Sequence, residues 1–369
     1  MYGGNKMTES KKIRFIIPLF LIFLMVFSAC GNQNEEASSN SNRTDSNSVA
    51  NNGSNTNDET NSEVEAQVIT VAHQQPETHP VNISFTEKLE PMIEENSNGQ
   101  LKVEIYGGAQ LGGERDVMEQ TQANQVQITH ISPVLGSIYP PVNLTDLPYL
   151  FKDFDHVDSV LEGELGQQIL EGMAEETGLR GMAFIDNGFR QITNNVREIN
   201  SLSDLEGLKI RVPEAPISIE NLSALGANVE TISYDELYSA LQQGVVDGQE
   251  NAYTTAASGK FYEVQKYVAE TRHMYGQNVI LVNDQWFTNL SAELQEVVME
   301  AIKETARYHN ELHRGQEEEN KQLLVDNGMI LTEPDLTEFR EASEVVYEKF
   351  YEENPDLKDL VEEIRSYGE

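Results

Sequence analysis

Two arginines stand in surroundings that are otherwise apolar or turn-forming, within the segment 184–216. Arg190 follows a short apolar run, and Arg211 lies in Lys209–Val212, where β-branched residues alternate with cations as in a short strand. Pro213 ends that strand because its ring fixes φ and removes a hydrogen-bond donor. Open α/β sheets present groups to ligands at the carboxyl ends of their strands, so both arginines are predicted to face one crevice.

Arginine is suited to the capture of a small anion. Its planar guanidinium matches a carboxylate through two parallel hydrogen bonds and stays charged at physiological pH. The chain has 25 Lys and Arg residues against 62 Asp and Glu residues, so cations are scarce. The two arginines are therefore interpreted as an anion clamp. Pairing of each arginine with a neighbouring acidic side chain remains the alternative that composition leaves open.

The charge and the cysteine usage exclude several classes of function. A formal net charge of -37 repels phosphate backbones and anionic lipid headgroups, which argues against nucleic acid as a partner. Cys30 is the only cysteine, so the chain cannot form an intramolecular disulfide, a CxxC metal site or a catalytic cysteine pair.

The first thirty residues have the pattern of a lipoprotein signal. A basic stretch at 11–14 precedes an apolar stretch at 15–27, which is short for a membrane span and suits a signal peptide. Two small residues then precede Cys30, and the arrangement resembles a bacterial lipobox, in which the cysteine is acylated and becomes the new amino terminus. Phe27 departs from the usual aliphatic residue. An ordinary signal peptide with an incidental cysteine is the alternative.

The remaining chain divides into a tether and a folded body. Residues 31–66 contain ten Asn and seven Ser among 36 residues without apolar periodicity, which predicts a flexible tether. From residue 67, strands and helices alternate, which predicts a mostly parallel sheet with helices on its faces, and 205–267 repeats the style in a second lobe. Periodic apolar residues from 291 to 325 predict one helix of about 50 Å that reaches across both lobes.

Local patterns also predict individual elements. The predicted strands are Gln67–Ala72, Leu101–Tyr106, 126–131 and 245–246, and predicted helices cover 81–95 and 114–123. Ser203 and Ser233 each precede a glutamate by three residues, the spacing of a capping box at a helix start. A glycine turn is predicted at Gly188, just before Arg190.

No catalytic motif is present in the sequence. Serine nucleophile elbows, Walker loops and GxGxxG fingerprints are absent, so no catalytic residue and no cofactor are predicted. His309 and His313 have the i, i+4 spacing of a zinc helix, but no glutamate directly follows His309 as the HExxH motif requires. The pair is interpreted as part of a solvated helix face, and no metal site is predicted.

Five motifs together resemble a known family. Their order and spacing are similar to those of DctP-type solute-binding proteins of tripartite ATP-independent periplasmic (TRAP) transporters, over about residues 67–350. The resemblance implies an α/β fold of two lobes, of the periplasmic-binding-protein class II type, with hinge strands, a long helix spanning both lobes and a cleft that closes over an organic acid. The motifs are 188–194 (GFRQITN), 208–213 (LKIRVP), 224–227 (ALGA), 241–251 (LQQGVVDGQEN) and 261–266 (FYEVQK).

The resemblance also implies roles for single residues in the second lobe. Arg211 resembles the arginine that takes the ligand carboxylate bidentately, and Arg190 is similar to a second cation at that end. Asn251 resembles an amide that donates to the carboxylate, and Tyr234 the aromatic residue beside the ligand. Ala252 stands where the family commonly has proline, which leaves the nearby loop less rigid.

Specificity would come from the other lobe. The resemblance points to 73–77, 110–115 and 131–134, with His73 and Glu114 as candidate ligand-binding residues. Ile131 stands where binders of sialic acid look acidic, so sialic acid is not expected. The 188–190 sequence resembles members that take uronates and related sugar acids, with C4-dicarboxylates as the alternative.

The expected function is therefore binding and delivery, without catalysis. The chain is expected to be lipid-anchored outside the cell membrane and to deliver its ligand to the small and large membrane subunits of a TRAP permease. A ligand sensor for a receptor kinase or chemoreceptor, and an enzyme acting on sugar acids, are the rival hypotheses. The expected parts are a signal peptide at 1–29, a lipidated tether at 30–66, a first lobe at 67–187 and about 277–316, and a second lobe at 188–276 and about 317–369.

Overall fold

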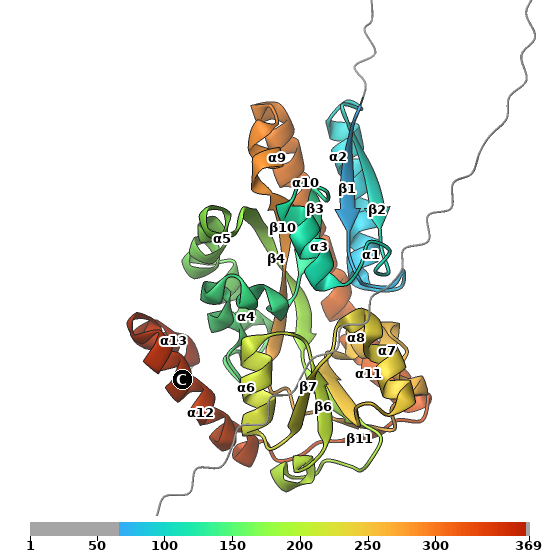
Figure 1. Ribbon diagram of the computed structural model, residues 1–369, viewed down its shortest axis with the longest axis vertical. Helices are drawn as coiled ribbons and strands as arrows, with labels where there is room; N and C mark the ends of the chain where they lie inside the picture. Colours follow the sequence, from blue (N-terminus) through green and yellow to red (C-terminus); the bar gives the residue numbers. More distant parts are fainter. Residues whose placement is uncertain (1–65, 367–369) are drawn as a thin grey trace, which may run out of the picture. The chain divides into compact units, whose positions relative to one another are not determined.

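Two β-sheets with helices over their faces make up the folded body (Figure 1). The computed structural model describes residues 66–366, so the predicted signal peptide, Cys30 and nearly all of the predicted tether lie outside the described residues. The first sheet has the strand order β2-β1-β3-β10-β4, with β1 (Gln67–Ala72), β2 (Leu101–Tyr106), β3 (Ile128–Ile131), β4 (Leu179–Phe189) and β10 (Tyr275–Asn283). The second has the order β11-β9-β5-β8-β6-β7, with β5 (Gln191–Asn194), β6 (Lys209–Val212), β7 (Asn228–Thr231), β8 (Gly248–Asn251), β9 (Tyr267–Ala269) and β11 (Ile330–Thr332).

The sheets are mixed rather than mostly parallel. β1 is parallel to β2 and β3, and β6 is parallel to β7 and β8, as the alternation of strands and helices predicts. The strands next to the crossings between the sheets run the other way: β10 is antiparallel to β3 and β4, and β5 is antiparallel to β8 and β9. The chain passes directly from β4 into β5 and returns from β9 into β10. The strands β5 and β10 that follow these crossings are therefore antiparallel to their neighbours in each sheet.

Helices cover both sheets. In the first lobe, defined here by the five-stranded sheet, they include α1 (Pro80–Ser84), α2 (Glu90–Asn96), α3 (Glu114–Gln122), α4 (Phe154–Leu161), α5 (Glu164–Thr177), α9 (Asp284–Asn289) and α10 (Ala292–Gly315). The second lobe, defined by the six-stranded sheet, includes α6 (Pro216–Ala224), α7 (Tyr234–Gln243), α8 (Tyr253–Ser258) and α11 (Glu317–Asp326). The last helices, α12 (Thr337–Glu353) and α13 (Lys358–Arg365), share a buried cluster with α4 and with Phe189 and Tyr275 at the crossings. Among residues 66–366, no helix has both the length and the apolar character that a membrane crossing requires.

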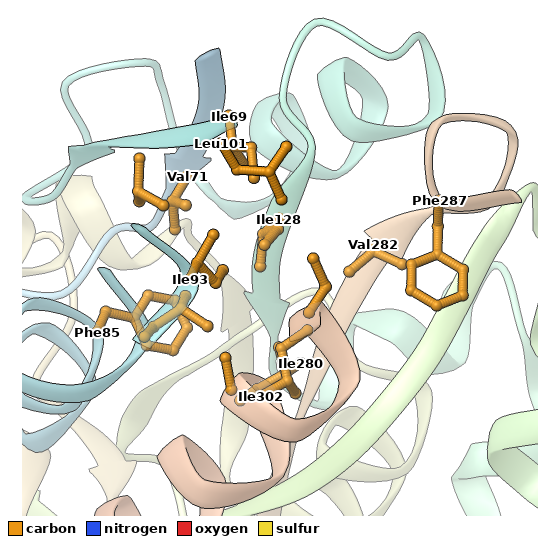
Figure 2. Packing of buried hydrophobic residues seen from close by; sticks show 14 of the residues in the cluster. Ile69, Val71, Phe85, Ile93, Leu101, Ile128, Ile280, Val282, Phe287 and Ile302 are labelled. Carbon is orange, nitrogen blue, oxygen red and sulfur yellow. The ribbon is translucent and has the colours of Figure 1, made fainter. Parts of the chain in front are cut away.

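The core of the first lobe lies between one face of its sheet and α10 (Figure 2). Ile69 and Val71 of β1, Ile128 of β3 and Ile280 of β10 are fully buried there against Ile302 of α10. Burial of each such side chain contributes about 1.5–3 kcal/mol. This packing fixes α10 against the strands that lead to the second lobe.

The predicted helix at 81–95 forms, with an irregular turn in its middle. The five residues Phe85–Leu89 are π-helical, and the Glu90 N–H donates to the Phe85 carbonyl five residues earlier. Pro91 follows at once and has no N–H to donate, so the regular hydrogen-bond ladder cannot continue through it.

The prediction of one helix from 291 to 325 is wrong. α10 ends at Gly315 and α11 begins at Glu317, so two helices share the segment. Glycine weakens a helix because its backbone loses more conformational freedom than that of any other residue. The start is as predicted, since the Ser291 side chain accepts from the Leu294 N–H.

Three other local predictions are also wrong. Ser201 and Asp204, rather than Ser203, form the capping box of the short helix Leu202–Leu205. Ser233 occupies the N-cap of α7 without a side-chain hydrogen bond. Residues 245–246 form a bend, and the strand begins only at Gly248, which lies against the Thr193 carbonyl where a larger residue would not fit.

His309 and His313 do not lie on a solvated face, so that interpretation is wrong. Both side chains are buried on α10, which packs over β4. The polar character of histidine suggested exposure, but the helix turns this face toward the carbonyl groups of the strand, which supply hydrogen-bond partners.

Gly188 lies within β4 rather than in a turn. The strand continues to Phe189, with a register shift against β10 between Gly276 and Gln277. Gly188 has φ +92°, and a Cβ added there would lie 2.6 Å from Cε1 of His313. The position therefore needs glycine for its backbone conformation and for close contact with α10.

We predict that Gly188→Ala destabilises the protein more than Gly207→Ala. Gly207 also has positive φ, at +77°, but nothing lies within 4 Å of its added Cβ. Each substitution should lose about 1–2 kcal/mol because alanine disfavours left-handed backbone, and Gly188→Ala should lose a further 1–3 kcal/mol or so from overpacking. Urea unfolding of both variants measures the difference, and equal losses would contradict the contact.

Candidate ligand-binding site

Arg211 has a buried guanidinium with little of its hydrogen-bonding capacity used. Its side chain is 2% exposed, and its Nε donates to the Ile232 carbonyl at 2.6 Å. Among residues 66–366, no carboxylate lies within ion-pair distance of it. Burial lowers the Arg211 pKa to about 10, which still leaves the group charged at neutral pH. The terminal nitrogens are thus free to meet an anion.

Arg190 has a carboxylate partner. Its Nε and Nη2 donate to the Glu250 carboxylate, and Nη2 also donates to the Glu250 carbonyl at 2.8 Å. Both side chains are buried, and the pairing of β5 with β8 brings them together. The pair carries no net charge, so the role of Arg190 as a second ligand cation stays a prediction.

Glu250 is held ionised by its surroundings. Burial acts to raise its pKa, but the charge of Arg190, the nearby His273 ring and the hydrogen bonds from Arg190 outweigh burial and set the pKa at about 2. The His273 Nε2 lies 3.4 Å from Oε2 of the carboxylate. Neither Glu250 nor His273 was among the predicted site residues, although Glu250 directly precedes Asn251 in the motif at 241–251.

Glu114 comes from the first lobe and faces the same arginines. It opens α3, and its carboxylate accepts from the Ser132 N–H and, at 3.0 Å, from the Ser132 hydroxyl. Burial raises the Glu114 pKa, while the Ser132 hydrogen bonds and the charges of Arg211 and Arg190 oppose that rise. A carboxyl group that resists ionisation therefore stands opposite the free guanidinium.

The two lobes touch beside this site. Arg115 of α3 donates from Nε to the Glu214 carboxylate, at 2.8 Å, just beyond β6. A Cβ added at Gly113 would lie 2.8 Å from Oδ1 of Asp235 on α7. Contacts between α3 and the second lobe thus place the Arg211 side chain where the two lobes meet.

The other predicted residues have different surroundings. Asn251 is buried, and its Nδ2 donates to Oε1 of Gln249 at 2.6 Å. Tyr234 begins α7, and its interaction with the Arg211 charge indicates that it lies near that guanidinium. His73 is fully buried, and its ring contacts are with Phe85 and His130. No described contact joins His73 to the arginines.

Asp146 is a buried acid near Arg190 that the sequence did not indicate. Its side chain is 1% exposed, and neither carboxylate oxygen has a hydrogen-bond partner among the described residues. Burial raises its pKa well above the ordinary value, while Arg190 and Gln277 act against the rise. Asp146 precedes Leu147 and Pro148, a pattern typical of an exposed turn.

We predict that Glu250→Gln destabilises the protein by about 3–5 kcal/mol, because it leaves the buried Arg190 charge unpaired. Glu304→Gln is the control, since Glu304 pairs with Arg307 on the exposed face of α10 and should show no measurable loss. Because the Glu250 pKa is depressed in the folded state, its stabilisation is complete above about pH 4.5 and is lost toward pH 2. Urea unfolding between pH 3 and pH 7 should show this loss in the parent protein and not in Glu250→Gln. A variant as stable as the parent would contradict the buried pair.

Two α/β lobes joined by crossing strands, with a free guanidinium buried where they meet, are the architecture of a two-lobed solute-binding protein. The chain belongs to the family described as bacterial extracellular solute-binding protein, family 7, whose model matches residues 71–354. This is the DctP family of the TRAP solute-binding proteins.

Relatives and solved structures agree with this assignment. The sialic acid-binding periplasmic protein SiaP of Vibrio cholerae is 33% identical over 271 residues, which cover 73% of this chain and 84% of that protein. A TRAP periplasmic solute-binding protein of Roseobacter denitrificans with bound β-D-glucuronate has TM-score 0.78 and 31% identity, with 81% of this chain and 99% of that chain covered. The sugar acid binding protein of Advenella mimigardefordensis in complex with galactonate has TM-score 0.78 and 28% identity, with 82% and 99% covered.

Proposed function

We propose that this protein captures a sugar acid in the cleft between its lobes and delivers it to the membrane subunits of a TRAP permease. The buried Arg211 guanidinium carries the proposal, because it is charged and has no carboxylate partner among the described residues. A ligand carboxylate can take both terminal nitrogens in a bidentate pair. The glucuronate and galactonate in the similar structures are acids of this class.

The charges in the cleft favour a ligand with one carboxylate. The Arg190–Glu250 pair is neutral as a unit, which leaves Arg211 as the cation available to an anion at this site. A second ligand carboxylate directed at the first lobe would meet Glu114, whose pKa is already raised by burial. Hydroxyl groups, by contrast, can donate to that carboxyl group. This arrangement favours sugar acids over the alternative C4-dicarboxylates.

Binding alone is sufficient for this function. A micromolar site needs about 8.2 kcal/mol of binding free energy. Charge-assisted hydrogen bonds contribute about 1.5–3 kcal/mol each, and closure of the cleft excludes water from them. The family consists of solute-binding proteins, and we assign no catalytic step to this chain.

The proposal includes a place and a partner. Acylation at Cys30 would hold the body outside the cell membrane through the segment 31–66, within reach of the permease subunits. Mass spectrometry of the mature protein tests the anchor, because acylation adds fatty acids to an amino-terminal Cys30, and an unmodified amino terminus elsewhere would contradict it.

We predict that uronates and aldonates raise the melting temperature and that succinate and malate do not. At a ligand concentration a thousand times Kd, the stabilisation is about 4.1 kcal/mol. Thermal-shift measurements on the full chain with each acid decide between the classes. Equal shifts with dicarboxylates would overturn the one-carboxylate assignment, and no shift with any acid would overturn the ligand class.

We predict that Arg211→Lys weakens sugar-acid binding by about 10- to 150-fold, because lysine keeps the charge but loses one charge-assisted hydrogen bond of the fork. Arg307→Lys is the control, since Arg307 pairs with Glu304 and Glu311 on an exposed helix face. Calorimetry with the acid that gives the largest thermal shift measures both. Unchanged affinity in Arg211→Lys would contradict the proposal that the ligand carboxylate binds Arg211.

A further inference from the structure

Five of the seven histidines in the chain gather in the first lobe. His73 follows β1, His79 caps α1, His130 lies in β3, and His309 and His313 lie on α10. All five side chains are at most 1% exposed. The His73 and His130 rings are 6.0 Å apart, and the stacked His309 and His313 rings are 5.9 Å apart. A charge on any of the other four would lower the pKa of His79, which indicates that all five lie close enough to form one cluster.

Two of these histidines bind the strand that leads to the second lobe. His309 Nε2 lies 2.9 Å from the carbonyl oxygen of Asp186, and His313 Nε2 lies 3.1 Å from that of Asn187. A carbonyl oxygen only accepts, so each Nε2 carries the hydrogen. Neither Nδ1 has a hydrogen-bond partner among the described residues. Both rings therefore suit the neutral form.

The bonded carbonyls lie close to the ligand site along the chain. Asp186 and Asn187 precede Gly188, which lies against the His313 ring, and Arg190 follows two residues later. Asn310 on the same helix accepts from the Asp186 N–H at 2.9 Å. One face of α10 thus fixes the carboxyl-terminal end of β4, just before the chain passes into β5 of the second sheet.

We propose that His309 and His313 are positioning residues that hold β4 at the crossing so that Arg190 meets Glu250, and that this hold lasts only while the histidine cluster is uncharged. Acid should then loosen α10 from β4. The consequence for ligand affinity rests on the proposed function, whereas the consequence for stability does not.

The groups around His309 and His313 act on their protonation in both directions. The Asp186 carboxylate accepts from Arg314 at 2.6 Å and from the Tyr275 hydroxyl at 2.5 Å, so it already has a cation. The Asp186 charge favours the charged forms of His309 and His313, and the Pro80 carbonyl of α1 favours that of His309. Arg314 and His309 oppose charge on His313.

The rings from the other elements add further repulsion. His73, just after β1, opposes charge on His130 and His79, and His130 of β3 opposes charge on His79. Asn82 and the Gln75 backbone, by contrast, favour charge on His73. Phe85, which packs edge-on against both rings, offers no acceptor. Once one ring is protonated, the next is harder to protonate.

Burial is the main reason that the pKa of all five histidines lies below 6.5, at about 4 for His73 and His313. Below about pH 6.5, these histidines are therefore protonated in the unfolded chain while they stay neutral in the folded chain. Stability is complete above about pH 6.5, falls as the pH drops below that value, and levels off only near pH 4. At pH 5.5, His73 and His313 each raise the unfolding constant about tenfold.

The test is urea unfolding of the full chain without ligand between pH 5 and pH 8. The double variant His309→Gln with His313→Gln keeps an N–H donor near each Nε2 but cannot titrate. The slope of the logarithm of the unfolding constant against pH should fall relative to the parent by about one proton for His313, whose pKa is about 4, and by a further amount for His309, whose pKa is also lowered. His156→Gln, on α4 outside the cluster, should lower the slope by less than the double variant does. An unchanged slope in the double variant would overturn the proposal.

Two further measurements separate positioning from packing. Affinity for glucuronate, or for the acid that binds best, should stay constant from pH 7.5 to pH 5.5 in the parent, because the cluster remains neutral in the folded protein over that range. It should weaken toward pH 4 in the parent and in His156→Gln, but less in the double variant. If the double variant does not fold, imidazole resonances of the parent protein decide, because titration of the cluster near pH 6.5 in the folded state would refute the neutral cluster. If no acid binds, the proposed function fails while the unfolding slope still tests the cluster.

Discussion

The rest of the structure depends on one constraint: the Arg211 guanidinium is buried and has no carboxylate partner among the described residues. Arg211 is buried at the end of β6, where its Nε is used by a backbone carbonyl and its terminal nitrogens remain available. Isolated buried charges are costly, so this position is best satisfied when an anion enters the cleft. The lobes meet around Arg211 through α3, with Glu114 and Arg115 on the opposite side.

The pair formed by Arg190 and Glu250 has a structural role beside the predicted site. It is buried and neutral as a unit, and it joins the residue that leaves β4 to a residue of β8. The pair therefore fixes the second sheet relative to the crossing strand, while α10 fixes the same strand from the first lobe. Arg211 is the residue that we propose for the ligand carboxylate, and a direct ligand contact of Arg190 stays a prediction.

Much of the fold could be predicted because it follows from local patterns. Alternation defined β1 and β2, Pro213 marked the end of β6, and the motifs around Arg211 indicated the family. The partner of Arg190 could not be predicted, since it depends on the pairing of β5 with β8 across a long stretch of sequence. His309 and His313 were misjudged because a polar pair on a helix looks solvated until the strand carbonyls beneath it are known. Asp146 gave no signal, since nothing local distinguishes a buried acid from one in an exposed turn.

The most direct measurement is a crystal structure of the protein with D-glucuronate bound. We expect the ligand carboxylate in bidentate contact with the terminal nitrogens of Arg211, the ligand hydroxyl groups toward Glu114, and the Arg190–Glu250 pair intact. A carboxylate bound to Arg190 with Glu250 displaced, or a ligand held away from both arginines, would contradict it.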